Sequence, residues 1–325
     1  MVRRGYFRDT GGETLPENMY DVIIIGTGPA GLTAGLYCGR ADLLTLVLGE
    51  MFDTQVAKTD LIENYPGFPE GISGMDLVTK MNDQARIYGV ETVSQMVKKV
   101  EKVDGGFKVI TGEGEYLGLS LIICTGASYR KLGIRGEEEF LNRGVSYCAT
   151  CDGPLFRDKD LAVVGGGNTA VGEAMFLTKF AKSVSLIHRR DRLRADKILQ
   201  KRALSSKKID PVWDSVVTEI VGDEMVEGVR LKNVKTGEER DLDCQGVFIL
   251  VGITPRTEFL DGFVDTDGGY IVVDRDMKTS VDGIYACGDV IKKDLRQVVN
   301  ACGEGADAAF DAQHYVEELK GVAYK

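Results

Sequence analysis

The chain has 325 residues, 43% of them hydrophobic, and a formal net charge of −10 from 50 acidic and 40 basic side chains. This length and apolar content predict a globular protein with about two domains. The acidic balance argues against a nucleic-acid or anionic-membrane surface, and no apolar run approaches the roughly 20 residues of a transmembrane helix. We therefore expect neither a nucleic-acid partner nor a membrane partner.

Residues 1–18 carry basic side chains with no apolar core behind them, which indicates a loose extension rather than a signal peptide. Without an export signal, the expected location is the reducing cytoplasm. Seven cysteines in that compartment do not indicate a disulfide framework. Five of them stand singly and are expected to be small buried apolar residues: Cys38, Cys124, Cys244, Cys287 and Cys302.

The first pattern in chain order is a strand, a glycine-rich turn, a helix and a second strand. The strands are expected at residues 22–25 and 45–48. In the GxGxxG turn, the first glycine permits a tight bend, the second lets backbone approach a pyrophosphate, and the third lets the helix pack on the strand. Glu50 follows the second strand, where it either meets a ribose hydroxyl or is simply solvated. The predicted dinucleotide-binding turn contains Gly26, Gly28, Pro29, Ala30 and Gly31.

A CxxC pair follows at Cys148 and Cys151, for which a metal site, a static disulfide and a redox-active dithiol are the three readings. Zinc needs two further ligands, and the only histidines are His188 and His314, with no second close cysteine pair. A static disulfide is disfavoured in a reducing compartment. The pattern therefore favours redox cycling and predicts no metal site.

A second glycine unit comes next, with strands expected at residues 161–164 and 183–187 and alanine in the third glycine position. The basic residues after its second strand suit the 2′-phosphate of NADP(H), which a carboxylate would repel; the alternative is a solvated basic segment. The residues predicted to bind the pyridine nucleotide are Gly165, Gly167, Asn168, Thr169, Ala170, His188, Arg189, Arg190 and Arg194.

A third pattern closes the chain: a short strand at residues 283–286 ends at Gly288 and Asp289, and a helix follows Arg296 and Gln297. With these three patterns in place, the chain from Met19 onward resembles the low-molecular-weight thioredoxin reductases. The segments that carry the resemblance are residues 26–31, 63–67, 125–134, 144–156, 163–174, 188–199, 279–290 and 296–297.

The resemblance implies an α/β fold with two Rossmann-like, three-layer domains built on central parallel sheets. The FAD domain would comprise residues 1–128 and 256–325, and the NADPH domain, residues 129–255, would be inserted into it and carry the CxxC pair. The cofactors would be non-covalent FAD and NADPH. The partner would be thioredoxin or a thioredoxin-like protein, and the protein would be a homodimer.

The resemblance also assigns roles to single residues. Cys151 would face the flavin, Cys148 would attack the partner disulfide, and Asp152 would act as acid and base for the thiols; the alternative for Asp152 is a turn carboxylate before Gly153. The glycine-containing connections near Gly126 and Gly252 would act as hinges between the domains. Further FAD contacts would come from Gln55, Asn64, Thr125, Gly126, Gly288, Asp289, Arg296 and Gln297.

The sequence departs from the family pattern at two places. Asp53 and Thr54 replace two glycines before Gln55, so the side chains are expected to alter that loop. Cys124 stands where alanine is usual, for which packing is the expected role. Two other functions stay open: a related flavin reductase that acts on a glutaredoxin-like or peroxidase partner, and an oxygen-dependent dithiol oxidase.

Overall fold

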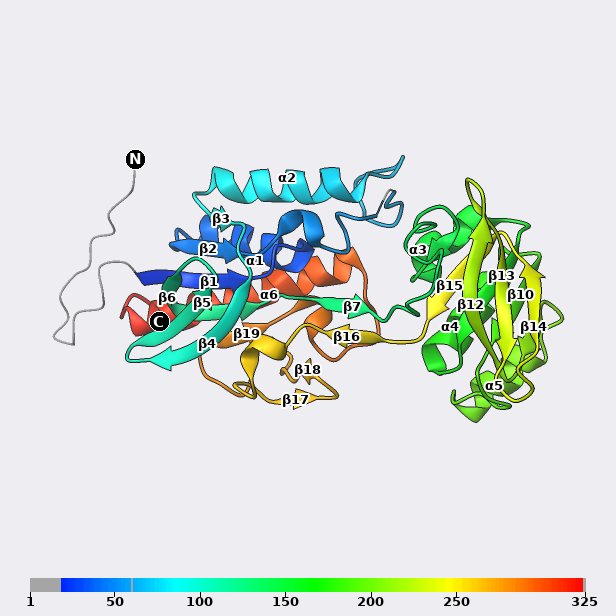
Figure 1. The fold of residues 1–325 in the computed structure, drawn as a ribbon. Coiled ribbons are helices and arrows are strands. Elements are labelled where there is room, and N and C mark those ends of the chain that lie inside the picture. The colour runs from blue at the N-terminus through cyan, green and yellow to red at the C-terminus, as the bar shows by residue number, and fades with distance from the viewer. Residues whose placement is uncertain (1–18, 60, 324–325) are drawn as a thin grey trace. The chain divides into compact units, whose positions relative to one another are not determined.

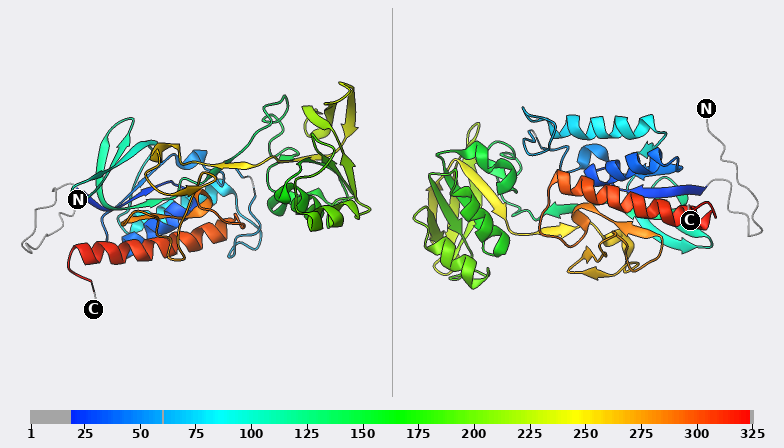
Figure 2. Two further views of the ribbon diagram at one scale, coloured as in Figure 1. Left: turned by 90° about the horizontal axis from the view of Figure 1, so that it is seen from below. Right: turned by 180° about the vertical axis from the view of Figure 1, so that it is seen from behind.

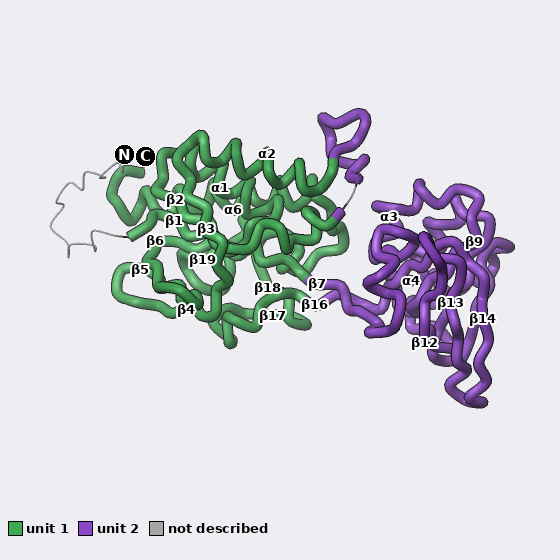
Figure 3. Tube along the Cα trace, turned by 45° about the horizontal axis from the view of Figure 1, so that its top comes forward, with its two compact units in different colours: residues 1–58, 73–127, 255–325 green, residues 59–72, 128–254 purple. Residues whose placement is uncertain are grey.

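The computed structural model describes residues 19–59 and 61–323; the extension expected at residues 1–18 lies outside this part. The chain forms two compact units (Figure 3). The first unit takes its residues from 1–58, 73–127 and 255–325, and the second unit from 59–72 and 128–254. No helix within the described residues is both long and apolar enough to cross a bilayer.

The first unit is built on a seven-stranded sheet in which β1 lies between β2 and β6 and pairs with both in parallel (Figure 1). The late strand β19 pairs in parallel with the end of β6, so the two ends of the chain share this sheet. An antiparallel hairpin, β4 and β5, extends the sheet beyond the parallel strands. The strands are β1 (Met19–Ile25), β2 (Thr45–Leu48), β3 (Glu91–Val93), β4 (Val97–Val103), β5 (Gly106–Thr111), β6 (Glu115–Ile123) and β19 (Ile284–Ala286).

Alternate residues of β1 enter two different cores, because side chains point to opposite faces of a sheet. Val22 and Ile24 pack with alanines of α1 and α6, and Ile23 and Ile25 pack with Phe107 and apolar residues of the opposite face. The helices α1 and α6 lie against each other along the first of these faces (Figure 2). The remaining elements are α1 (Pro29–Arg40), η1 (Met51–Asp53), α2 (Gly74–Ile87), η3 (Glu258–Leu260), β17 (Thr266–Asp267), β18 (Tyr270–Ile271), η4 (Gly288–Val290) and α6 (Val298–Leu319).

The second unit has a five-stranded parallel sheet in the order β11-β10-β9-β15-β8. One face packs on the helices through Leu161, Val163 and Leu177, and the other packs on the three-stranded antiparallel sheet β12-β13-β14 through Ala162 and Val229. Its elements are β8 (Val145–Ser146), α3 (Ala149–Asp152), η2 (Gly153–Phe156), β9 (Asp160–Gly165), α4 (Asn168–Leu177), β10 (Ser183–Ile187), α5 (Lys197–Leu204), β11 (Ile209–Val212), β12 (Ser215–Gly222), β13 (Val226–Asn233), β14 (Glu239–Asp243) and β15 (Gly246–Leu250).

Two short strands, β7 (Ala127–Tyr129) and β16 (Ile253–Pro255), connect the units and pair with each other. The pairing is continued by the Arg130 N–H, which donates to the Gly252 carbonyl at 2.9 Å, and by the Arg256 N–H, which donates to the Gly126 carbonyl at 3.0 Å. Gly126 and Gly252 have φ values of 69° and 122°, a region that favours glycine. Each of the two connections between the units therefore contains a glycine with a positive φ value.

The fold class predicted from sequence is confirmed: both units are α/β with parallel strands at their centre. The strands expected at residues 45–48 and 183–187 have those bounds, and those expected at residues 22–25 and 161–164 are slightly longer at one or both ends. The antiparallel β4–β5 hairpin and the sheet β12–β14 are additions that the glycine motifs alone do not predict.

Candidate functional site

The first glycine turn, residues 26–31, links the carboxyl end of β1 to α1 and leaves no room for side chains at two of its glycines. Gly26 has φ +126°, and a Cβ there would lie 2.2 Å from the Cys124 carbonyl oxygen. A Cβ on Gly31 would lie 1.9 Å from the Gly26 carbonyl oxygen. Gly28 differs, because a Cβ there would meet no described protein atom within 4 Å. The turn is thus tight on the protein side and open beside Gly28, as a phosphate cradle requires.

Residues far apart in sequence meet beside this turn. The Cys124 N–H donates to the Ile25 carbonyl at 2.7 Å, which places Thr125 and Gly126 beyond the end of β6. A Cβ on Gly288 would lie 3.0 Å from the Ala30 Cβ, so the loop after β19 also reaches the turn. Gly28 caps α1 without a side-chain hydrogen bond. The first N–H groups of α1 can therefore donate hydrogen bonds to an anionic ligand at this edge.

The loop between β19 and α6 holds a compact charged network that the sequence did not reveal. The Glu304 carboxylate accepts the Gly288 N–H at 2.9 Å and pairs with Lys293 Nζ at 2.6 Å. Lys293 also lies 3.4 Å from Asp289, the carboxylate predicted to bind a cofactor hydroxyl. Lys293 and Glu304 thus fix the loop on which Asp289 stands.

Arg296 and Gln297, both predicted FAD contacts, stand at the start of α6, where Gln297 is the N-cap residue. The Arg296 guanidinium lies 4.9 Å from the centre of the Tyr270 ring. Its buried Nε atom has no hydrogen-bond partner among the described residues. A buried donor left without a partner by the protein fits a site whose ligand supplies the acceptor.

The loop after β2 does not need the glycines that the family pattern would place there. Thr54 has φ −70°, a value open to any residue, and Asp53, the last residue of η1, pairs with Lys58. Gln55 donates to the Ala127 carbonyl and so contacts the chain just beyond Gly126. Glu50 is exposed at the end of β2. In this chain the loop therefore contains a short 3₁₀ turn with a surface ion pair between Asp53 and Lys58.

Asn64, the remaining predicted FAD contact, lies outside the first unit. It belongs to residues 59–72, which group with the second unit, where an isolated bridge joins Ile62 to Ile72.

The second glycine turn, residues 165–170, repeats the first with one difference in its third position. A Cβ on Gly165 would lie 2.5 Å from both the Leu250 carbonyl oxygen and the Ala170 Cβ. Gly167 is open, because a Cβ there would meet only Arg194 Nη2, at 4.0 Å. Asn168 bonds the Asp196 backbone N–H and side chain, at 2.8 and 3.0 Å, and Thr169 is exposed on the first turn of α4.

The basic segment predicted to bind a 2′-phosphate lies directly beside this turn. The Arg194 and Ala195 N–H groups donate to the Gly166 carbonyl at 2.6 and 3.1 Å. Arg189, Arg190 and Arg194 are exposed at the carboxyl end of β10, with positive charge free to meet an anion. The segment therefore combines backbone anchoring with solvent-facing guanidinium groups.

His188 is the buried member of this segment. A Cβ on Gly166 would lie 2.3 Å from His188 Nδ1, so the ring packs directly on the glycine turn. Burial lowers the pKa of His188, and the nearby charges of Arg194, Arg190 and Arg189 lower it further. Its buried Nε2 has no hydrogen-bond partner among the described residues. A neutral imidazole with an unused ring nitrogen fits a ligand contact at this turn.

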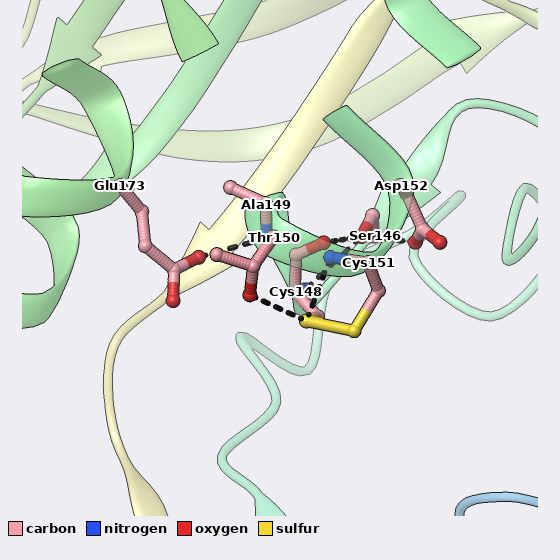
Figure 4. Close-up of a disulfide and its surroundings, with 7 residues drawn as sticks. All are labelled: Ser146, Cys148, Ala149, Thr150, Cys151, Asp152 and Glu173. Carbon is pink, nitrogen blue, oxygen red and sulfur yellow. Dashed lines mark hydrogen bonds between the residues drawn. A yellow bond between two sulfur atoms is a disulfide. The ribbon is translucent and has the colours of Figure 1, made fainter. Parts of the chain in front are cut away.

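The redox turn, residues 146–152, contains a disulfide between Cys148 and Cys151 with a Cα–Cα distance of 5.3 Å (Figure 4). Cys148 is the N-cap of α3, and its Sγ accepts the Cys151 N–H at 3.2 Å. Thr150 Oγ1 lies 3.4 Å from the same sulfur. Both cysteines are half-buried, so the disulfide is partly accessible to solvent.

Two neighbouring side chains hold the backbone of the redox turn, and sequence reasoning missed both. Ser146 Oγ accepts the Cys148 N–H at 3.0 Å and donates to Asp152 Oδ2 at 2.6 Å. Glu173 of α4 accepts the Ala149 N–H at 2.8 Å through its Oε2. Asp152 is thus linked through one hydroxyl to the backbone of Cys148, which fixes its carboxylate within the redox turn.

Tyr147 anchors the same turn from the side that precedes Cys148. Its ring stacks on Tyr129 with centroids 5.1 Å apart, and its hydroxyl donates to the buried Glu137 at 2.8 Å. Burial and then the Glu137 carboxylate raise the pKa of Tyr147, so the phenol keeps its proton at physiological pH. The neutral, stacked Tyr147 therefore fixes the backbone position from which the redox turn continues to Cys148.

None of the five single cysteines is in a disulfide, and four of them are buried as predicted: Cys38, Cys124, Cys244 and Cys287. Cys302, also expected to be buried, is half-buried on α6. Burial raises the pKa of Cys38 and of Cys244 to about 12, and it also raises the pKa of Cys124. Cys124 and Cys287 lie with their sulfurs 3.3 Å apart behind the first glycine turn. Their contact supports the packing role expected for Cys124.

These burials predict a sharp division of thiol reactivity. In reduced, folded protein, DTNB should titrate the two thiols of the redox turn rapidly, because thiolate formation and access both favour them. The four buried thiols should react only after denaturation. Mass spectrometry of the labelled peptides identifies the fast pair, and rapid labelling of Cys38 or Cys244 in folded protein would contradict the assignment.

Comparison with known proteins agrees with this chemistry. The sequence model of the pyridine nucleotide-disulphide oxidoreductase family matches residues 20–305, which is most of the chain. Two glycine turns of dinucleotide-binding type and a disulfide in an accessible turn define the same class, an oxidoreductase that works on disulfides with a pyridine nucleotide.

Individual relatives narrow the class. The thioredoxin reductase of Listeria monocytogenes is 50% identical over 309 residues, covering 94% of this chain and 96% of that protein, and that of Bacillus subtilis is 46% identical over 94% and 97%. The crystal structure of thioredoxin reductase from Streptococcus pyogenes matches with a TM-score of 0.87 and 47% identity, over 93% of this chain and 99% of that one. The chain belongs to the thioredoxin reductase family, whose enzymes use FAD and NADPH.

Proposed function

We propose that this protein reduces the disulfide of thioredoxin through Cys148 and Cys151, using NADPH and FAD. The observation that carries the proposal is the disulfide in an accessible, half-buried turn within the unit that also contains the second glycine turn. The direct test follows NADPH oxidation at 340 nm with oxidised thioredoxin added or omitted. Consumption that depends on thioredoxin is the expected result, and consumption that ignores it would contradict the proposal.

The proposed reaction is a pair of thiol-disulfide exchanges. When bound, FAD and NADPH supply the two electrons that convert the Cys148–Cys151 disulfide into a dithiol. The Cys148 thiolate then attacks one sulfur of the partner disulfide, the partner S–S bond breaks, and its second sulfur leaves as a thiol after taking a proton. Cys151 attacks the mixed disulfide at Cys148, which closes the enzyme disulfide and releases the reduced partner.

Asp152 is the proposed carrier of the protons in these exchanges. The carboxylate is linked through Ser146 Oγ to the backbone of Cys148, at 2.6 and 3.0 Å. In this proposed role, Asp152 would take the proton of one cysteine and give a proton to the leaving thiolate. Ser146 would then be a positioning residue, because it orients Asp152 without meeting the partner.

We assign FAD to the first unit and NADPH to the second. The open space at Gly28, the unpartnered Arg296 Nε and the fixed loop of Asp289 support a flavin site in the first unit. The exposed arginines after β10 support a 2′-phosphate site in the second. The glycines that link the units, Gly126 and Gly252, remain the proposed hinges, and a crosslink that immobilises the units should abolish turnover while flavin stays bound.

The arginines give a specific prediction for coenzyme choice. Replacing Arg189 and Arg190 together by alanine should raise the KM for NADPH by about 10- to 100-fold, because charge-assisted hydrogen bonds to the 2′-phosphate are lost. The KM for NADH should change little. Arg202→Ala, which removes an exposed charge from α5 of the same unit, is the control. An equal rise in the KM for NADPH and for NADH would show that these arginines do not bind the 2′-phosphate.

Three broader assignments accompany the proposal: thioredoxin or a thioredoxin-like protein as partner, a homodimer, and a cytoplasmic location. Five cysteines that form no disulfide fit a reducing compartment, since disulfide-paired cysteines would be expected elsewhere. Val299 and Phe310 are exposed apolar residues of α6, 45% and 58% exposed, which supports association of two copies. Light scattering at several concentrations tests the dimer; a constant monomer mass would contradict it.

A further inference from the structure

One carboxylate at the redox turn, that of Glu173, has no role in the exchange chemistry. Glu173 stands on α4, the helix that begins at the second glycine turn, and its Oε2 accepts the N–H of Ala149 at 2.8 Å. Ala149 follows Cys148 directly and is fully buried. Glu173 therefore binds the backbone of the redox turn from a different element (Figure 4).

Glu173 completes the set of polar groups that holds the N–H donors of this turn. Ser146 takes the N–H of Cys148, Glu173 takes that of Ala149, and the Cys148 sulfur takes that of Cys151. Removing Glu173 would leave a buried amide without an acceptor, which costs more than the hydrogen bond itself contributes. The position of Cys148 thus depends on a residue 24 positions further along the chain from its neighbour Ala149.

Glu173 also brings a carboxylate against the backbone of Ala149, the residue that follows Cys148. Burial raises the pKa of Glu173, and the N–H that Ala149 donates to it offsets only part of this rise. Two carboxylates contact the turn, Asp152 through Ser146 and Glu173 through Ala149. A nearby negative charge disfavours a thiolate, and a less stable thiolate makes the dithiol form less favourable against its disulfide.

We propose that Glu173 is a positioning residue that fixes the redox turn through the Ala149 N–H and keeps the Cys148–Cys151 pair strongly reducing through its negative charge. This inference rests on the proposed redox role of the pair. Its two parts are separable, because the hydrogen bond needs only an oxygen acceptor, whereas the effect on the thiols needs the charge. Glutamine, a neutral amide of the same shape, keeps the hydrogen bond and removes the charge.

The test compares Glu173→Gln and Glu173→Ala in FAD-loaded enzyme. In glutathione buffers at mildly alkaline pH, Glu173→Gln should shift the Cys148–Cys151 equilibrium toward the dithiol by about two- to tenfold, and alkylation of Cys148 should be faster by a similar factor. Thioredoxin turnover in Glu173→Ala should fall by about tenfold or more, since the buried amide loses its acceptor. Glu173→Gln should retain most of the turnover, because its side-chain oxygen can still accept the Ala149 N–H.

Glu138→Gln is the matched control, because it removes a carboxylate of the same unit that is 77% exposed and paired with Lys131 at the surface. It should leave the equilibrium and the alkylation rate unchanged. An unchanged equilibrium in Glu173→Gln would overturn the electrostatic part, even if Glu173→Ala failed to fold. Equal loss of turnover in both variants would overturn the positioning part. A Cys148→Ser enzyme that still reduced thioredoxin would instead overturn the proposed function.

Discussion

Replacing Cys148 by serine is expected to reduce thioredoxin turnover by more than about 10³-fold, because a hydroxyl group cannot take the place of the thiolate in thiol-disulfide exchange. NADPH should still bleach the flavin absorbance, since the glycine turns, Arg296 and the basic segment are untouched. The measurement is anaerobic spectroscopy of the flavin alongside the turnover assay. Separation of these two readouts assigns the defect to the exchange step and not to cofactor binding.

The paired variant Cys151→Ser tests the order of the two sulfurs. Cys148 would keep its attack on the partner but lack the second thiol that releases it, so a stable mixed disulfide with thioredoxin should accumulate at Cys148. Non-reducing electrophoresis and peptide mapping detect the adduct. Cys244→Ala, which removes a buried thiol of the same unit, is the control and should form none. An adduct that forms with Cys148→Ser instead would reverse the proposed roles.

The residues that define the cofactor turns could be predicted from sequence because their constraints are local. Gly26, Gly31 and Gly165 are needed where backbone atoms approach to 1.9–2.5 Å of a Cβ position, and such positions recur at fixed spacing after a strand. The third glycine position of each motif shows that the requirement for glycine depends on the immediate neighbours. Gly31 faces a carbonyl oxygen at 1.9 Å, whereas the equivalent Ala170 keeps its Cβ by standing against Gly165.

The groups that support these sites could not be predicted in the same way, because their partners are distant in sequence. Glu173 meets Ala149 across 24 residues, and Glu304 meets Gly288 across 16. Neither glutamate differs in its local sequence from a solvated helical residue. Ser146 is closer, two residues before Cys148, but its role depends on the bend that brings Asp152 back to its hydroxyl. Motif spacing identifies the groups that meet ligands, and only packing identifies those that hold them.

Substitutions at two glycines of the first glycine turn should affect protein stability and FAD binding differently, because the two glycines have different neighbours. Gly31→Ala should lower the melting temperature of the apoprotein and prevent FAD binding, because its Cβ would overlap the Gly26 carbonyl oxygen at 1.9 Å and displace α1. Gly28→Ala should leave the apoprotein melting temperature unchanged, since no described protein atom lies within 4 Å of its Cβ and its φ of −77° suits alanine.

The same Gly28→Ala change should weaken FAD binding by about 10- to 100-fold, which corresponds to roughly 1–3 kcal/mol of overlap between the new methyl group and the pyrophosphate. Flavin retained after gel filtration and titration of apoprotein with FAD measure the loss. Gly172→Ala is the matched control, because its Cβ on α4 also has no described neighbour within 4 Å. If Gly28→Ala bound FAD as tightly as Gly172→Ala, the open space beside Gly28 would not be where the pyrophosphate lies.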